Sequence, residues 1–421
     1  MIARLLPEGI TPTARTLLCG RGLRAFADGF VSLLLPAYLT VLGFSPLEVG
    51  VIATATLLGS AALTLWVGMA AHRFGRQGLL VAASLLMILT GAGFLVETDY
   101  WPLLVIAFVG TLNPSSGDVS VFLPLEQALL AESIEDRHRT SVFAVYGLVG
   151  SLVASLGALA AGLPDLLRVL VPMGLAQALQ TMFALYMVLG LATFLLYRHM
   201  PASHANVRRE RQQRLGQSKG IVLRLAALFS IDAFGGGFFV QSLLALWFFD
   251  RFGLSLSAAA SIFFWTGFLA AFSYPAAARL SRRVGLINTM VFTHLPSNLC
   301  LMLMPFAPSL WVAVALLLVR SALSQMDVPT RTSYVMAVVM PAERTAAASI
   351  TSVPRSLASA LSPSIAGYLL TLSGFGWPLV IGGAIKAVYD LLLLAMFRHV
   401  RPPEEQVAGE PPTRHTIPKR G

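Results

Sequence analysis

One sequence pattern occurs twice in this chain, once in each half. Gly75 follows Gly43 by 32 residues, and Gly285 follows Gly253 by the same interval. The two copies are 210 residues apart in a chain of 421. Further matches, at an offset of 205 residues, are Arg139 with Arg344, Ser151 with Ser356, and Gly162 with Gly367. A repeat of this period restricts the fold to two similar units in tandem.

The chain is too apolar to fold in water. Hydrophobic residues make up 56% of it and charged residues 12%, where soluble domains have roughly a quarter. In lipid every backbone amide needs a partner within the protein, so the apolar stretches are expected to be helices of about 20 residues. We predict an all-α membrane protein with twelve transmembrane helices. The expected spans are 20–43, 47–70, 78–96, 101–131, 141–162, 173–196, 221–249, 255–278, 285–306, 310–339, 345–371 and 375–397.

Two repeated halves in one orientation predict two pseudo-symmetric six-helix bundles that rock about a central site. We expect an N-terminal bundle over 1–196 and a C-terminal bundle over 221–398. A charged stretch over 197–220 is expected to be a cytoplasmic linker, and 399–421 a disordered cytoplasmic tail, because both are rich in polar and charged residues.

Two of the spans are longer than a bilayer requires. They cover 101–131 and 310–339, which are equivalent places in the two halves. Both contain proline: Pro114 and Pro124 in the first, Pro329 in the second. We interpret each as one tilted, kinked helix that runs past the membrane.

The distribution of positive charge predicts the topology. Arginine and lysine gather in alternate loops, as the positive-inside rule requires, so both termini are expected to be cytoplasmic. This pattern also explains the net charge of +10 without nucleic acid. Compact loops fit an integral protein of the bacterial inner membrane, and we expect it to be a monomer in the lipid bilayer.

Ionisable residues inside a membrane are costly, and they mark functional positions. Seven of the ten that lie deep in the predicted spans fall in spans 1, 4, 7 and 10, which predicts a polar central pathway. The ten are Asp28, Asp118, Glu126, Asp232, Arg320, Asp327, Arg331, Arg355, Lys386 and Asp390.

Three of the acids are candidates for proton coupling: Asp28, Asp118 and Asp232. A carboxylate in a partly dry site can take up and release a proton within a transport cycle. The alternative is a hydrogen-bonded structural carboxylate in each case. Glu126 lies near the cytoplasmic end of its span, where a gating or interface role is favoured.

Arg320, Asp327 and Arg331 are spaced by seven and four residues and therefore share one helical face. They could bind a polar or anionic substrate and gate it, or form a salt-bridge ladder within the helix. Lys386 and Asp390 have i,i+4 spacing and are expected to neutralise each other.

No enzyme, cofactor or metal motif stands out. The chain has no Gly-x-x-x-x-Gly-Lys-Ser/Thr loop for a nucleotide and no paired His/Cys spacing for a metal. We therefore expect a small-molecule substrate, no cofactor and no catalytic residues.

The loop after span 2 resembles a known signature. It reads Gly68-x-x-x-His72-Arg73-Phe-Gly75-Arg76, similar to the Gly-x-x-x-Asp-Arg-x-Gly-Arg loop of the major facilitator superfamily. A degenerate copy with Arg283 and Gly285 follows span 8. The resemblance implies two six-helix bundles, a cavity lined by helices 1, 4, 7 and 10, and alternating access. It also implies that Arg73 and Arg76 hold one conformation closed, with His72 in place of the acid.

Two functions stay open at this point. The first is a proton-coupled secondary transporter, an antiporter that exports a small organic compound. The second is a uniporter or symporter of an organic or inorganic anion, bound by arginines of the cavity. Drug/proton antiporters of the family usually carry a Gly-Pro pattern late in helix 5, and here that helix ends at Gly162 without the pair. The equivalent stretch of the second half, Ser362-Pro363-x-x-x-Gly367, is closer to the pattern and favours export slightly.

Overall fold

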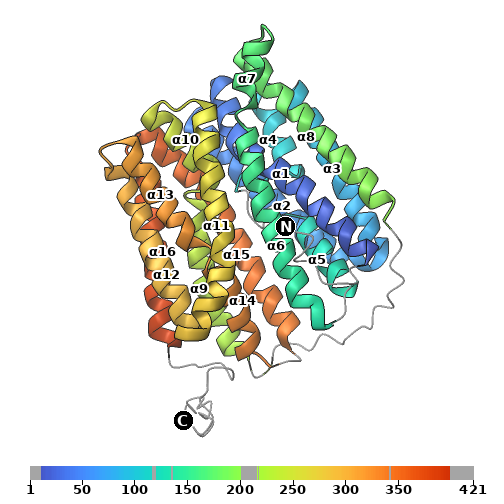
Figure 1. Ribbon diagram of the computed structural model, residues 1–421, viewed down its shortest axis with the longest axis vertical. Helices are drawn as coiled ribbons and strands as arrows, with labels where there is room; N and C mark the ends of the chain where they lie inside the picture. Colours follow the sequence, from blue (N-terminus) through green and yellow to red (C-terminus); the bar gives the residue numbers. More distant parts are fainter. Residues whose placement is uncertain are drawn as a thin grey trace, which may run out of the picture.

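The computed structural model describes residues 11–115, 120–133, 136–200, 216, 218–340 and 343–398. Of residues 70–72, 136–141, 278 and 344–345 it describes the backbone alone. The described residues form helices and no strands, which confirms the predicted all-α fold. Figure 1 shows the helices running along one long axis, with the short helix α7 projecting at one end.

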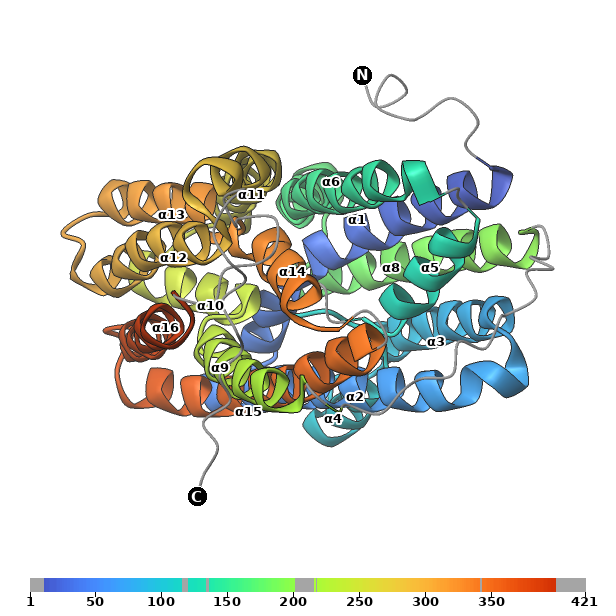
Figure 2. The ribbon, with the colours of Figure 1, turned by 90° about the horizontal axis from the view of Figure 1, so that it is seen from below.

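The helices before residue 200 and those after residue 218 form two groups (Figure 2). Figure 2 shows α1–α8, here called the N half, on one side and α9–α16, the C half, on the other. The N half consists of α1 (Pro12–Val41), α2 (Pro46–Phe74), α3 (Arg76–Val96), α4 (Tyr100–Val109), α5 (Phe122–Glu132), α6 (Asp136–Ala160), α7 (Leu163–Leu170) and α8 (Leu175–Arg198). The C half consists of α9 (Lys219–Gly237), α10 (Gln241–Phe252), α11 (Leu256–Val284), α12 (Leu286–Leu303), η2 (Met304–Phe306), α13 (Leu310–Ser324), α14 (Asp327–Val338), α15 (Arg344–Leu372) and α16 (Trp377–Phe397).

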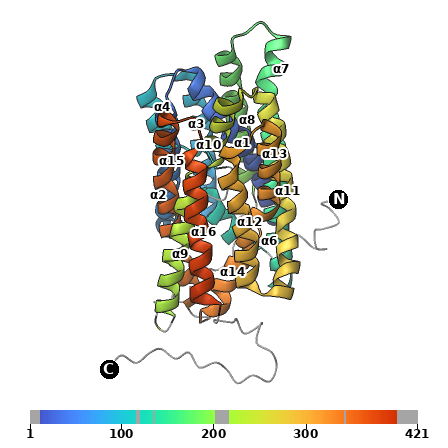
Figure 3. The same cartoon turned by 90° about the vertical axis from the view of Figure 1, so that its left-hand side faces the viewer.

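The helices have the length and surface that a bilayer requires. Ten stretches of the described residues are long and apolar enough to cross a membrane. The other two predicted spans correspond to the α4–α5 pair and to α15. Large apolar side chains face outward, among them Trp101 at 73% and Trp311 at 78% exposure, two tryptophans that the repeat relates. Figure 3 shows the C-half helices lying side by side along the same axis.

Three predicted spans are broken rather than continuous. Span 4 divides into α4 and α5, and span 10 divides into α13 and α14, so the prediction of one kinked helix in each was wrong. Span 7 divides into α9 and α10 immediately after Gly235-Gly236-Gly237, where three residues without side chains weaken the helix. Span 1 remains one helix, α1, although it contains Pro36.

Local sequence explains the matching loops of the two halves. Ser45 caps α2, where Glu48 completes a capping box. Gly75 connects α2 to α3 with φ of 71°, and Gly285 connects α11 to α12 with φ of 88°. Residues with a side chain rarely adopt a positive φ, and glycine does so freely. Both turns require a positive φ, so glycine is favoured in each.

The two halves touch near the end of the array that lies away from the arginine-rich loops. A Cβ on Gly50 of α2 would collide with the backbone of α15 at Pro363 and Gly367. Nearby, the Ser364 amide donates to Thr54 Oγ1 at 3.0 Å. Further contacts between the halves are Ser257 N to Asp165 Oδ2 at 3.0 Å, Gln241 Nε2 to Ser32 Oγ at 3.0 Å, and Ser242 N to the Pro114 carbonyl at 3.0 Å.

Replacing Gly50 with alanine should weaken this contact, because the new methyl group meets backbone atoms that cannot rotate away. We expect a loss of about 1–3 kcal/mol in the free energy of unfolding, the usual result of overpacking. Thermal unfolding of the purified protein in detergent would measure it. Gly147→Ala is the control, because nothing lies within 4 Å of a Cβ there. Equal unfolding temperatures for the two variants would contradict the prediction.

Candidate functional site

A buried ion pair joins α1 to α5 in the N half. Arg24 Nε donates to Glu126 Oε1 at 3.0 Å, and its Nη2 donates to the second carboxylate oxygen. Arg24 is 2% exposed and Glu126 is 0% exposed. The guanidinium carbon also lies 4.3 Å from the ring centroid of Phe122. A two-point pair of this kind fixes the distance between two helices and also their relative orientation.

Two tyrosines complete the coordination of Glu126. The hydroxyl groups of Tyr146 on α6 and Tyr197 on α8 both donate to its carboxylate. Tyr197 reaches it because Gly20 leaves room on α1, where a Cβ would overlap the phenol ring. Arg24, Glu126, Tyr146 and Tyr197 are here called the N-half cluster. The predicted gating role of Glu126 remains a hypothesis, and the structure places this side chain within one bundle.

Asp28 lies one turn from Arg24 on the same helix and is buried. Asn113, in the segment between α4 and α5, forms a hydrogen bond with its side chain. Asp118, the third predicted proton-coupling residue, lies outside the described residues. Of the three candidates, Asp28 and Asp232 can therefore be placed.

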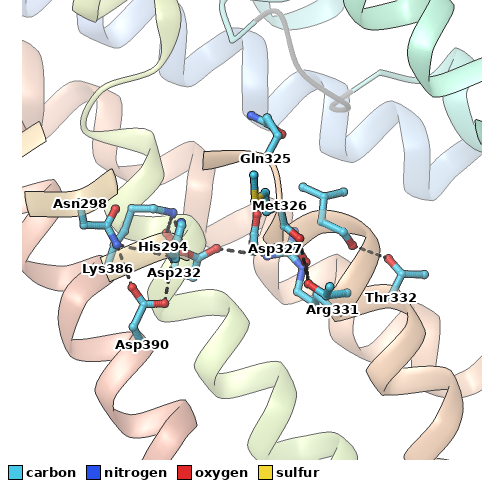
Figure 4. Close-up of polar contacts among 12 residues, drawn as sticks. Asp232, His294, Asn298, Gln325, Met326, Asp327, Arg331, Thr332, Lys386 and Asp390 are labelled. Carbon is cyan, nitrogen blue, oxygen red and sulfur yellow. Dashed lines mark hydrogen bonds and ion pairs between the residues drawn. The ribbon is translucent and has the colours of Figure 1, made fainter. Parts of the chain in front are cut away.

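Asp232 is the central residue of a charged cluster in the C half (Figure 4). It lies on α9 and is 3% exposed. Its Oδ1 accepts from Lys386 Nζ of α16, and its Oδ2 accepts from Arg331 Nη1 of α14 at 3.2 Å. The same Arg331 nitrogen lies 3.2 Å from Asp327 Oδ2. Asp232, Asp327, Arg331 and Lys386 are here called the C-half cluster, and their charges balance.

The glycine run on α9 allows Lys386 to reach Asp232. A Cβ on Gly235 would lie 2.8 Å from Lys386 Cγ and 3.0 Å from the Gly382 carbonyl oxygen. The lysine side chain therefore crosses a bare face of α9 to reach the acid near the next turn. The glycine run that interrupts span 7 therefore also leaves the space through which the Lys386 side chain passes.

Asp390 has different partners from those predicted. The expected Lys386–Asp390 pair does not form, because Lys386 turns to Asp232 on the neighbouring helix. His294 Nδ1 of α12 lies 2.9 Å from Asp390 Oδ1, and Asn298 Nδ2 donates to Asp390 Oδ2 at 2.9 Å. Asp390 is 0% exposed, and His294 is also buried. Figure 4 shows this group beside the C-half cluster.

The repeat relates the two clusters. Glu126 is the fifth residue of α5, and Arg331 is the fifth residue of α14. The two differ by 205 residues, the offset found in the sequence. These equivalent positions of the two halves therefore carry opposite charges.

The partner positions are related in the same way. On α1, the Phe26 carbonyl lies against Gly157 of α6, and on α9, the Phe234 carbonyl accepts from Ser362 Oγ of α15 at 2.6 Å. Gly157 and Ser362 are also 205 residues apart. Arg24 and Asp232 each lie two residues before their phenylalanine. The N-half pair is therefore Arg–Glu, and the C-half pair in the equivalent place is Asp–Arg.

Arg320 is separate from these clusters. Its guanidinium carbon lies 4.8 Å from the ring centroid of Phe239, in the break between α9 and α10. Its Nε is buried and has no hydrogen-bond partner among the residues that the structure describes. No described carboxylate forms an ion pair with it. The predicted ladder therefore connects Asp327 and Arg331 but leaves out Arg320.

The signature loop is only partly described. Arg76 forms an ion pair with Glu132 at the end of α5, while Arg73 and Arg283 are exposed. The side chain of His72 lies outside the description. Gly68 lies on an exposed turn of α2, where a Cβ would meet nothing within 4 Å. The proposed role of this loop in alternating access stays a prediction.

A pocket of about 160 Å³ opens beside the C-half cluster, between α9, α14 and α15. Arg331, Phe229 and Arg355 line it together with polar side chains and the apolar Val335 and Met336. Within the described residues, no group of His, Cys, Asp and Glu could hold a metal ion.

Comparison with known proteins agrees with this architecture. The sequence model of the Major Facilitator Superfamily matches residues 17–324 and 297–419. An uncharacterized membrane protein of Saccharomyces cerevisiae, YJR124C, is 23% identical over an alignment 413 residues long; the match covers 89% of this chain and 92% of the yeast protein.

Solved structures show the same fold at low sequence identity. A D-xylose-proton symporter has a TM-score of 0.73 and 16% identity, covering 93% of this chain and 98% of its own. The nucleoside transporter NupG has a TM-score of 0.71 and 12% identity, covering 92% and 100%.

Removing one charge of the buried Arg24–Glu126 pair should cost more stability than removing both. We expect Glu126→Gln to lower the free energy of unfolding by about 3–5 kcal/mol, because it leaves a buried cation without its partner charge. The double variant Arg24→Met, Glu126→Gln should recover a large part of that loss. Thermal unfolding in detergent would measure both.

The control for this experiment is Arg76→Met, which breaks the half-exposed pair with Glu132. Exposed pairs contribute about 0–1 kcal/mol, so its effect should be small. A Glu126→Gln variant no less stable than Arg76→Met would contradict the prediction.

Proposed function

The chain belongs to the Major Facilitator Superfamily, and within this family of membrane transporters we propose that it is a proton-coupled antiporter that exports a small organic compound. The observation that carries the proposal is the position of Asp232. One carboxylate there binds two cations from two other helices, Lys386 of α16 and Arg331 of α14.

A proton on Asp232 would weaken both of these ion pairs at once. The charge that holds α14 and α16 to α9 would disappear, Lys386 would lose its partner, and Arg331 would keep only Asp327. The conformation of the C half would then depend on the protonation of a single side chain, which is what coupling requires. The D-xylose-proton symporter with the same fold is a precedent for a proton as the coupling ion.

The contacts between the halves support assigning this conformation to one state of the transport cycle. They lie away from the arginine-rich loops, at Gly50, Thr54, Asp165 and Ser257. If those loops are cytoplasmic, as the positive-inside rule favours, this conformation is closed on the outer side. We infer both termini to be cytoplasmic and the protein to be an inner-membrane monomer. Export as the direction rests on the proline pattern at Pro363.

A specific observation favours the alternative of an anion carrier. Arg320 is a buried cation without a described carboxylate partner, and it lies in the middle of a broken span. An anionic group of a substrate would supply the missing partner. In this mechanism Arg320 binds the substrate, while the C-half cluster holds the helices together.

Asp232→Asn should abolish transport driven by a pH gradient while leaving the protein folded. The assay uses vesicles with an imposed pH gradient and compounds selected by thermal-shift screening at two pH values, since a bound ligand raises stability. We expect at least about a tenfold loss of flux, equivalent to about 1.4 kcal/mol. Asp28→Asn tests the second candidate in the same way.

Asp99→Asn is the matched control, because Asp99 is exposed and its side chain makes no capping hydrogen bond with α4. Its flux should equal that of the wild type. Proton-driven flux that survives in Asp232→Asn would remove this residue from the coupling mechanism.

For the alternative, Arg320→Lys should weaken the binding of anionic compounds by about tenfold, because lysine lacks the planar fork that binds a carboxylate or phosphate at two points. The shift in unfolding temperature with ligand would measure this. Equal shifts for the variant and the wild type would count against anion binding at Arg320.

A further inference from the structure

Asp390 is a buried acid that lacks a fixed counter-charge. It is fully buried between α12 and α16, and no lysine or arginine of the described residues lies within ion-pair distance of it. Its two oxygens are bound by His294 Nδ1 and by the neutral amide of Asn298. An isolated buried carboxylate costs several kcal/mol, so this position favours one bound proton, shared with the imidazole.

The neighbouring C-half cluster does not supply that charge. Asp232 and Asp327 are balanced by Lys386 and Arg331, and this cluster is neutral by itself. The N-half pair of Arg24 and Glu126 is also neutral. The His294–Asp390 pair is made neutral by a proton rather than by a lysine or arginine.

Lys386 is in a position to exchange between the two acids. It lies one turn from Asp390 on α16, at the i,i+4 spacing that brings two side chains together, yet it binds Asp232. Other groups near His294 are the Tyr389 ring, with its centroid 6.2 Å away, and the carboxylate of Asp232, whose charge acts on the imidazole. Lys386 is therefore the cation that can replace a proton at Asp390.

We propose that His294 and Asp390 form a proton-binding site, and that Lys386 exchanges between Asp232 and Asp390 as this proton moves. In one state the imidazolium of His294 neutralises Asp390, and Lys386 neutralises Asp232. In the other, the proton has left the imidazolium nitrogen and one has bound to a carboxylate oxygen of Asp232, while Lys386 neutralises Asp390. The number of protons and the total charge are the same in both states.

The exchange links a site in the bundle interior to the broken span. When Lys386 leaves Asp232, its side chain also leaves the bare face of α9 at Gly235. The role of the site in transport rests on the proposed coupling at Asp232, but the binding of a proton to His294 does not. It can therefore be tested without a substrate.

The experiment is a pH titration of the histidine side chains by nitrogen-15 NMR, on the full chain in lipid nanodiscs. The chain has seven histidines, so the signal missing from His294→Gln assigns the residue. Asp232→Asn should lower the titration midpoint of His294 by about one pH unit, a tenfold change in proton affinity, because Lys386 then turns to Asp390. Lys386→Met should raise the midpoint, because Asp390 loses its replacement cation.

The double variant Asp232→Asn, Lys386→Met distinguishes the exchange of Lys386 from a direct electrostatic effect of Asp232 on His294. If Lys386 carries the effect, Asp232→Asn should shift the midpoint far less in the Lys386→Met background than in the wild type. Thr293→Val is the control, because the buried Thr293 hydroxyl donates to its own helix at 2.8 Å, and its substitution should leave the midpoint unchanged.

Two results would overturn the proposal: a His294 that does not titrate, or equal shifts by Asp232→Asn in both backgrounds. If Asp232→Asn does not fold, Lys386→Met decides alone, and an unchanged or lowered midpoint would refute the exchange. A titrating His294 with normal proton-driven flux in Asp232→Asn would refute the coupling at Asp232, and leave the proton site intact.

Discussion

The carboxylate of Asp232 connects three helices of the C half, and much of the inferred chemistry depends on it. A charged group in a membrane protein is tolerated only where other charges or dipoles surround it. Here α9, α14 and α16 each contribute to one balanced cluster. The arrangement is most stable while the acid is ionised, because Lys386 and Arg331 are buried cations that it neutralises. The packing of α9, α14 and α16 is therefore sensitive to the protonation of Asp232.

The ion pairs Arg24–Glu126 and Asp232–Arg331 occupy equivalent places with opposite polarity, as expected when two copies of a duplicated unit diverge in sequence. An ion pair holds the first and fourth spans together in the N half, and another joins the equivalent spans in the C half, with the charges exchanged. Either polarity gives the same attraction between the same two helices. The N-half acid is bound by two tyrosine hydroxyls as well as by Arg24, whereas the C-half acid is shared between Arg331 and Lys386. The two halves can thus be equivalent in shape and different in response to pH.

The sequence was sufficient for the fold, because hydropathy, the repeat and the signature loop all depend on local patterns. The break in span 7 also has a local cause, the glycine run before Phe238. The breaks in spans 4 and 10 were missed, since proline is compatible with both a kink and an interruption.

The site residues were harder to predict from the sequence, because the ion pairs of a helix bundle form between helices that are distant in sequence. Arg24 was overlooked because the first span was expected to begin at residue 20, whereas α1 begins at Pro12 and holds this arginine in its interior. His294 was overlooked because its partner is 96 residues away. The Lys386–Asp390 pair was wrong because spacing on one helix shows which groups can meet, and a competing acid on another helix decides which do.

The interrupted fourth and seventh spans have one more consequence. Where a helix stops inside a membrane, its terminal amides and carbonyls need new partners. The Ser242 amide at the start of α10 finds one in the Pro114 carbonyl beyond α4, so an unwound segment of one half satisfies an unwound segment of the other. If the halves separate at this point, both peptide groups must be hydrated in the same step. Entry of water into the middle of the molecule would then be a condition of the movement rather than its by-product.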